Sequence, residues 1–327
     1  MRKDRIMQKM KSQINTLSKT TGSTWGLLLI QARQVYTAVV RPALTYEALA
    51  WHQPHQQPFP ILKPTKVGIT AKLAKQQNMC LQLVTDTYKA TPLITLEAEA
   101  YIPPLDLHLD SVVSRALKRM KKSGMACQIE AACTVIRKKL RRREQNHQVF
   151  LTVIAHFKSL PADWTQFWIP PTEDTQSKLQ NSAKRELLCR WKTQWAVRKS
   201  LWEKIETSES THKMLRLHKG LFKAQSFIAI QLQSGKTGLT AFLHQRKVPG
   251  FSSSDCSCGR GRETPKHVMI HCIKHSETHR RLEINEQVDL RKMMFSPEEL
   301  QTITAWWLKQ DLLSQFQLAQ KLERHSL

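Results

Sequence analysis

The chain has 327 residues, with 51 Lys and Arg against 26 Asp and Glu, and a formal net charge of +25 at pH 7. This length allows about two domains, and the presence of only 10 glycines excludes collagen-like and glycine-rich classes. No apolar run is long enough to predict a membrane-spanning helix. So large a positive charge is typical of proteins that bind nucleic acid, and we expect nucleic acid as the partner and no membrane.

The first residues carry charge without the apolar segment of a secretory signal, so we expect no export. The seven cysteines are an odd number in a long chain, which favours a reducing, intracellular compartment over a disulfide framework. A basic run at residues 138–143, K-K-L-R-R-R, favours the nucleus over the cytoplasm.

The N-terminal half is predicted to be helical. Apolar positions three and four residues apart predict a basic helix over residues 2–20. A second helix is expected over residues 23–46, kinked or ended by Pro42. A proline-rich loop at 52–66 then precedes a helix over about 68–88. The buried face of the first helix would hold Ile6, Met10, Ile14 and Leu17.

The next stretch, residues 111–145, is predicted to be a long basic helix bent at Gly124. It holds eleven basic residues against two acidic ones. A surplus of this size exceeds what solubility needs and indicates a surface that faces phosphates. The residues expected to contact nucleic acid are Arg115, Lys118, Arg119, Lys121, Lys122, Arg137, Lys138, Lys139, Arg141, Arg142 and Arg143.

Residues 151–182 contain prolines and few periodic apolar positions, so they are expected to form a linker. It would separate a helical bundle over 1–150 from a helical region over 183–327. Strand-like alternation is nearly absent, so the expected fold class is mainly α. Tryptophans at the start of the second region are interpreted as core residues and not as base-stacking platforms: Trp191, Trp195 and Trp202.

Cysteine and histidine cluster within a small module at residues 250–280, spaced as C-x-C-x8-H-x4-C. Thiolate and imidazole ligands at these separations can surround a structural Zn²⁺, and four protein ligands leave no open position for water. A short helix beginning near Thr264 makes His271 and His275 alternative ligands. A chance cluster of reduced cysteines is the competing interpretation. The expected ligands are Cys256, Cys258, His267 and Cys272.

The sequence predicts no catalytic residue. It lacks a P-loop, a glycine-rich dinucleotide loop and a G-x-S-x-G elbow. None of its aspartates is adjacent to another, as a two-metal enzyme would favour. Asp106 and Asp110 are four residues apart, but a capping or solvent-facing role is the stronger interpretation. No Mg²⁺ site is therefore predicted.

Four segments, in this order, resemble fungal non-LTR retrotransposon reverse transcriptases. Residues 23–54, which begin S-T-W-G and include A-R-Q-V-Y and R-P-A-L-T-Y-E-A-L-A-W, are similar to the region after the polymerase active site, with Glu47 where that family has glycine. Residues 71–109 resemble its thumb or connection helices. Residues 232–272 resemble its Cys/His module, and residues 305–322 its terminus.

The chain departs from this family in two respects. The Tyr-x-Asp-Asp motif of the polymerase palm is absent, and the segment at 147–185 is too short for a ribonuclease H domain. The resemblance therefore implies a non-catalytic fragment that binds nucleic acid, RNA before DNA, with other retrotransposon-encoded chains as possible partners. Two alternatives stay open. The chain is an accessory part of an RNA-directed DNA polymerase whose palm lies on another chain, or it is a pseudogene product without a selected function.

Overall fold

The structure is a computed structural model, and it confirms the mainly α fold class. Among the residues it describes, β pairing is limited to two isolated bridges, Thr21–Gly26 and Asp255–Arg262. No helix in the described part is long and apolar enough to cross a membrane. The described residues are 2–22, 25–46, 48–52, 68–122, 128, 173–201, 213–281, 290–310, 312–313 and 316.

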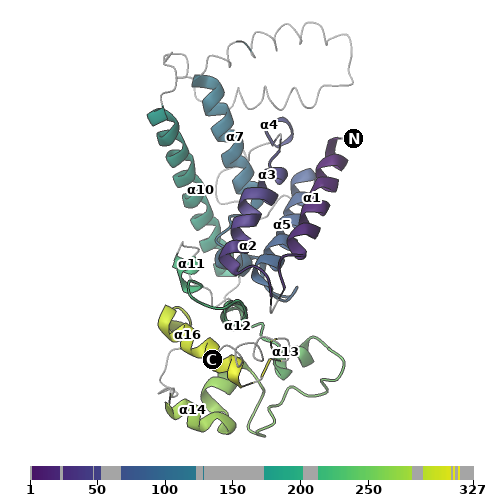
Figure 1. The fold of residues 1–327 in the computed structure, drawn as a ribbon, viewed down its shortest axis with the longest axis vertical. Helices are drawn as coiled ribbons and strands as arrows, with labels where there is room; N and C mark the ends of the chain where they lie inside the picture. Colours follow the sequence, from purple (N-terminus) through teal and green to yellow (C-terminus); the bar gives the residue numbers. More distant parts are fainter. Residues whose placement is uncertain are drawn as a thin grey trace. The chain divides into compact units, whose positions relative to one another are not determined.

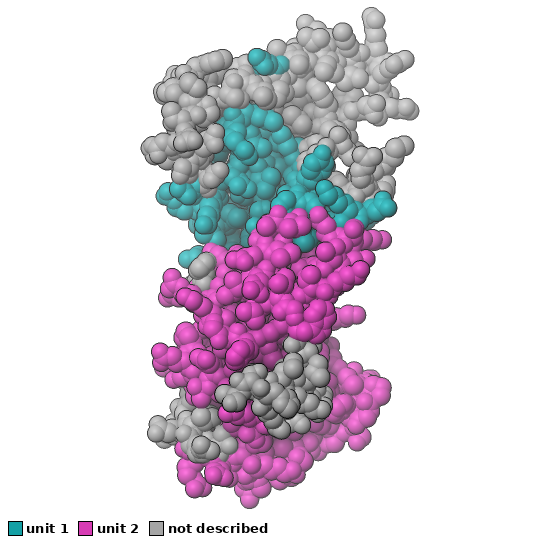
Figure 2. All heavy atoms as spheres, in the orientation of Figure 1, with its two compact units in different colours: residues 1–10, 40–77, 103–201 teal, residues 11–39, 78–102, 202–327 magenta. Residues whose placement is uncertain are grey.

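The chain divides into two compact units that interleave along the sequence (Figure 2). Unit 1 comprises residues 1–10, 40–77 and 103–201. Unit 2 comprises residues 11–39, 78–102 and 202–327.

The helical elements of the N-terminal half match the expected order (Figure 1). They are α1 (Arg2–Ser18), α2 (Leu29–Val35), the π-helical turn η1 (Tyr36–Val40), α3 (Arg41–Leu44), α4 (Ala48–Trp51), α5 (Ile69–Thr85), α6 (Leu93–Glu99) and α7 (Leu105–Lys122). In α1, the predicted apolar positions Met10, Ile14 and Leu17 are buried, and α5 lies within the predicted range.

The second predicted helix begins later than expected, at Leu29, because a backbone hydrogen bond closes a turn of the chain just before it. The N–H of Leu27 donates to the Thr20 carbonyl at 3.0 Å. Gly26 makes the turn possible with φ +84°, a conformation that side-chain-bearing residues rarely adopt. The expected irregularity at Pro42 is confirmed. Because proline has no N–H to donate to the preceding turn, the helix widens into η1 just before it.

In unit 1, α7 packs against α10 (Glu173–Leu201) and α4 around a buried carboxylate. Asp110 Oδ1 lies 2.7 Å from His52 Nε2, and Arg190 Nη2 donates to Asp110 Oδ2 at 2.8 Å. The contacts with the His52 imidazole and the Arg190 guanidinium offset the free-energy cost of removing the Asp110 carboxylate from water. Trp191 and Trp195 of α10 are buried, as predicted for core residues.

Two helices begin earlier in the chain than predicted. Helix α10 begins at Glu173, inside the range predicted as a linker, while residues 151–172 lie outside the described residues. Helix α7 begins at Leu105 and not at 111, because the helix can start directly after the Pro103–Pro104 pair. Trp202 also lies outside the described residues.

Unit 2 is built around α12 (Lys223–Ser234). Residues 223–233 of this helix are all buried. Its apolar side chains pack with Val268, Met269 and Trp307 in the main core, and a smaller cluster gathers around Leu221 and Ala229. The other elements of this part are α11 (Lys213–Leu217), α13 (Thr240–Gln245), η3 (His267–His271), η4 (Ile273–His275), α14 (Ser276–Arg281), α15 (Leu290–Met294) and α16 (Pro297–Lys309).

A buried polar pair joins two segments of unit 2. Glu99 Oε2, at the end of α6, lies 3.2 Å from His218 Nε2, and both side chains are 0% exposed. Burial raises the pKa of Glu99, and the hydrogen bond from His218 opposes this shift. The pair links α6 to the turn after α11 through a polar contact that water does not reach.

Breaking this pair is expected to destabilise the fold. Glu99→Ala or His218→Ala should lower the free energy of unfolding by about 3–5 kcal/mol, because each leaves a buried polar group without its partner. Glu99→Gln should cost less, since an amide keeps a hydrogen bond without a charge. Urea unfolding measures these changes. Glu298→Ala on the exposed start of α16 is the control, and equal losses in Glu99→Ala and this control would contradict the expectation.

Candidate metal centre

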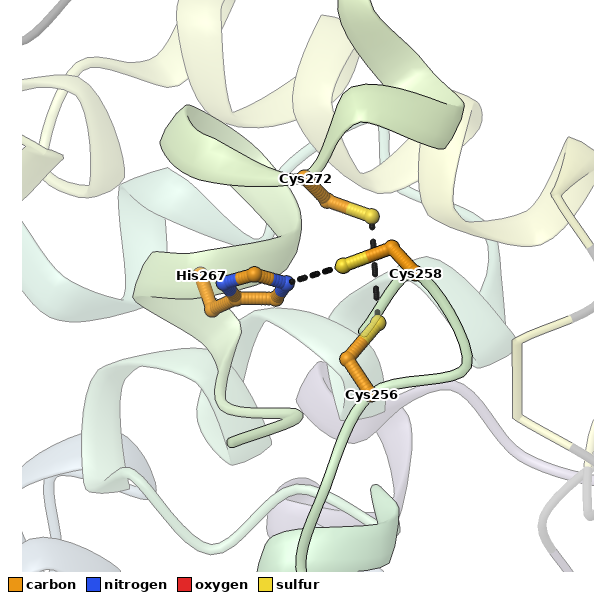
Figure 3. A group of neighbouring side chains, drawn as sticks. All are labelled: Cys256, Cys258, His267 and Cys272. Atoms are coloured by element: carbon orange, nitrogen blue, oxygen red, sulfur yellow. Dashed lines mark hydrogen bonds between the residues drawn. The ribbon is translucent and has the colours of Figure 1, made fainter. Parts of the chain in front are cut away.

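The four predicted ligands converge at one point, as Figure 3 shows. Their ligand atoms all lie within 4.8 Å of one another. Cys256 Sγ is 3.8 Å from Cys272 Sγ, and Cys258 Sγ is 3.1 Å from His267 Nε2. These three thiols and one imidazole can hold a metal ion, and we call the four residues the metal group.

The first two ligands are presented by a tight loop. The Cys256 carbonyl accepts the N–H of Gly259 at 2.9 Å, and the Cys256 N–H donates to the Gly261 carbonyl at 2.7 Å. Gly259 and Gly261 have φ of +75° and +137°, so the reversal uses the freedom predicted for glycine here. The N–H of Arg260 points at Cys258 Sγ at 3.4 Å, an arrangement that favours a thiolate at this position.

The other two ligands lie at either end of the π-helical turn η3. The N–H of His267 donates to Thr264 Oγ1 at 3.2 Å, and the N–H of Cys272 donates to the His267 carbonyl at 2.8 Å. Between them, Val268 and Met269 are buried in the main core of unit 2. The core therefore holds this half of the group in place, while the loop carries the other half.

The surroundings shift the pKa values of the ligands in different directions. Burial raises the pKa of Cys256 to about 11. The backbone N–H of Arg260 lowers the pKa of Cys258. Burial and the neighbouring His271 lower the pKa of His267, which favours the neutral imidazole that binds metals. A buried thiolate at Cys256 thus needs a nearby positive charge, which a metal ion would supply.

The alternative ligands are not part of this group. His271 is exposed and lies outside the cluster of four. His275, one turn further on, packs edge-on against Trp306 with ring centroids 5.3 Å apart. Cys272 takes the fourth position because η3 ends there and its backbone turns extended.

The segment that contains the four metal-ligating residues carries mostly positive exposed charge. Residues 244–281 include three acids, Asp255, Glu263 and Glu277. Lys274 reaches over the loop, where its Nζ donates to Ser257 Oγ between the two cysteine ligands at 2.8 Å. The exposed cations in this range are Arg246, Lys247, Arg260, Arg262, Lys266, Lys274 and Arg280.

Three of the residues predicted to contact nucleic acid have described side chains, all on α7. Arg119 is exposed, and Lys118 Nζ lies 3.9 Å from Glu186 Oε2. Partial burial and the neighbouring Arg119 both lower the pKa of Arg115. The side chains of Lys121 and Lys122 and all of Arg137, Lys138, Lys139, Arg141, Arg142 and Arg143 lie outside the described residues.

The two aspartates of α7 are engaged to different extents, and Asp106 Oδ2 is buried without a hydrogen-bond partner among the described residues. Both oxygens of Asp110 are engaged by His52 and Arg190, and Asp106 Oδ1 accepts the N–H of Leu107 at 2.9 Å. The sequence analysis did not identify three exposed cations on α10, the helix that packs against α7. Their signal in the sequence was the run of basic residues along this helix, between and beside the tryptophans. They are Lys184, Arg185 and Lys192.

Comparison with known proteins assigns no family. No protein-family model, curated protein or solved structure matches this chain. The likeness to retrotransposon reverse transcriptases thus rests on the sequence motifs.

Proposed function

We propose that this chain binds the phosphate backbone of nucleic acid, RNA before DNA, and that a structural Zn²⁺ holds part of the binding surface in shape. The observation that carries the proposal is the placement of a metal-binding group inside a segment whose exposed charges are mostly positive. The role is binding without catalysis.

The donor set supports zinc. Three thiolates and one imidazole are a ligand set typical of structural zinc, with zinc–sulfur distances of about 2.3 Å. A regular tetrahedron of that size has sulfur–sulfur edges of about 3.8 Å, and Cys256 Sγ and Cys272 Sγ are 3.8 Å apart. The corresponding sulfur–nitrogen edge is about 3.6 Å; the observed separation between Cys258 and His267 is shorter, at 3.1 Å. When bound, zinc would fold the loop at Cys256–Cys258 onto η3.

A second basic surface lies on unit 1, where α7 and α10 pack together. Arg190 pairs with Asp110 near the start of α7, and Glu186 approaches Lys118 further along, so the helices run antiparallel. This register brings exposed cations of both helices to the same level, namely Arg119, Lys184 and Arg185. Like charges held together in this way favour an anionic partner.

The sequence motifs extend this proposal to a biological setting. The chain would be the non-catalytic part of a non-LTR retrotransposon reverse transcriptase that holds template or transcript. If another chain supplied the palm, this one would serve as its accessory nucleic-acid-binding part.

Zinc content tests the metal site. The purified chain is expected to carry about one zinc per molecule by atomic absorption, and Cys256→Ser or Cys272→Ser should reduce this to below about 0.2, because each removes a thiolate ligand. Cys189→Ser, which changes an exposed cysteine on α10, is the matched control and should retain the metal. Less than about 0.2 zinc in the unmodified chain would exclude the site.

The salt dependence of binding tests the phosphate contacts. Fluorescence anisotropy with a structured RNA and a DNA duplex should show affinity falling steeply from about 50 to 200 mM salt. The variant Arg119→Gln, Lys184→Gln, Arg185→Gln should lower the slope of log affinity against log salt by about 0.9 per lost contact on the duplex, since fewer counterions are released.

A charge-preserving variant is the control for this measurement. Arg119→Lys, Lys184→Arg, Arg185→Lys keeps every positive charge and should keep the slope. An unchanged slope in the glutamine variant would rule out this surface as a contact. Failure of the unmodified chain to bind either nucleic acid at about 50 mM salt would refute the proposed function.

A further inference from the structure

We propose that unit 2 carries a site for single-stranded nucleic acid, in which bases stack on the exposed rings of Trp25 and Phe222 while phosphates meet a row of cations on α11 and the turn that follows it. This inference rests on the proposed function and makes it specific. It assigns a ligand class to a surface that is separate from the metal group.

In the described part of unit 2, two aromatic side chains are more than half exposed. Trp25 is 56% exposed and Phe222 is 64% exposed, whereas Trp191 and Trp307 are fully buried. Exposed rings of this size lose the stabilisation that burial would provide, about 1.5–3 kcal/mol for a fully buried phenylalanine. A flat partner such as a nucleobase can cover them instead.

A lysine holds these two residues near each other, although they are far apart in the sequence. Phe222 is the residue before α12, and its neighbour Lys223 donates from Nζ to the carbonyl oxygen of Trp25. The Trp25 carbonyl also accepts the N–H of Gly22, and the chain turns back at Gly26 directly after it, so the Trp25 backbone is fixed. Both rings therefore extend from backbone that is tied to the start of α12.

The lysine in this contact has a structural role. Lys223 is buried, and its Nζ lies 5.5 Å from the ring centroid of Phe227. Burial lowers the pKa of Lys223 to about 8, and the nearby Asp86 opposes this shift. Asp86 is also the acid that faces this ammonium group. Lys223 is thus engaged within the protein, and phosphate contacts must come from other cations.

Those cations lie directly before Phe222. Lys213, Arg216 and Lys219 are exposed at every third position, and the residues between them, Met214, Leu215, Leu217 and His218, are buried. Because the apolar side chains hold α11 against the core, the cations project into solvent. The surrounding sequence leaves them without acids nearby in the chain, since residues 210–254 contain no Asp or Glu.

The combination of rings and cations selects a single strand. Phosphates along any nucleic acid can meet the three cations, but stacking on an exposed ring needs a base that is free of its pair. In a duplex the base faces are already covered by their neighbours. Stacking does not depend on base identity, so the site is expected to accept sequences broadly.

The test compares two ligands of equal charge. Fluorescence anisotropy is measured with a labelled 20-nucleotide dT strand and with a 20-unit abasic strand that has the same number of phosphates. The unmodified, zinc-loaded chain should bind dT more tightly by about 5- to 140-fold for each stacked base. Trp25→Leu and Phe222→Leu should bring this ratio toward one, because leucine keeps apolar volume and removes the ring.

Ring-preserving and charge variants complete the design. Trp25→Phe and Phe222→Tyr should keep the preference for dT. A preference lost only in the leucine variants then results from removal of the aromatic ring and not from misfolding. Lys213→Gln, Arg216→Gln, Lys219→Gln should weaken both ligands alike and lower the salt slope by about 0.7 per lost contact.

The outcomes separate this inference from the proposed function. Equal binding of the dT and abasic strands by the unmodified chain, with a steep salt dependence, would overturn the stacking site and leave phosphate binding intact. An undiminished dT preference in the leucine variants would also overturn it. A chain that binds none of these strands, and neither RNA nor duplex, would refute both.

Discussion

The burial of α12 is the constraint on which unit 2 depends. Every residue from 223 to 233 is buried, including glutamines and one lysine, so the surrounding elements must supply both apolar contacts and hydrogen-bond partners. Gln233 Nε2 donates to the Met294 carbonyl at 2.9 Å, and Thr237 Oγ1 donates to the Gln231 carbonyl at 3.1 Å. The neighbours satisfy these groups only in part, because Gln231 Oε1 and Gln233 Oε1 are buried and have no hydrogen-bond partner among the described residues.

The metal group is an extension of that same core. Val268 and Met269 pack with the apolar residues of α12, so η3 and its two ligands are held before any metal binds. The loop with Cys256 and Cys258 has no comparable apolar anchor. The conformation of this loop depends on the chain reversal at Gly259 and Gly261 and on the β-bridge between Asp255 and Arg262. A metal ion would therefore stabilise mainly the loop, where the burial of apolar side chains contributes least to stability.

The sequence was sufficient for features that depend on local pattern. Periodic apolar residues predicted α1 and α5, because each helix buries one face and exposes the other. The spacing of three cysteines and one histidine predicted the metal group, since close spacing leaves few ways to arrange four ligands. The start of α2 was predicted too early, because a turn closed by the bond from Leu27 to Thr20 precedes it. Lys223, 198 positions away, also contacts this turn. Neither propensity nor spacing reports such a contact.

The same limit explains why the surfaces of positive charge could only be partly predicted. A count of charges identified α7, but the pairing of Asp110 with Arg190 and His52 is what aligns α10 beside it. Likewise, the exposed cations at every third position of α11 and the turn after it have meaning only because the residues between them are buried. The net charge alone predicts only that a partner would be anionic. Tertiary packing decides which charges reach solvent, and thus where such a partner can bind.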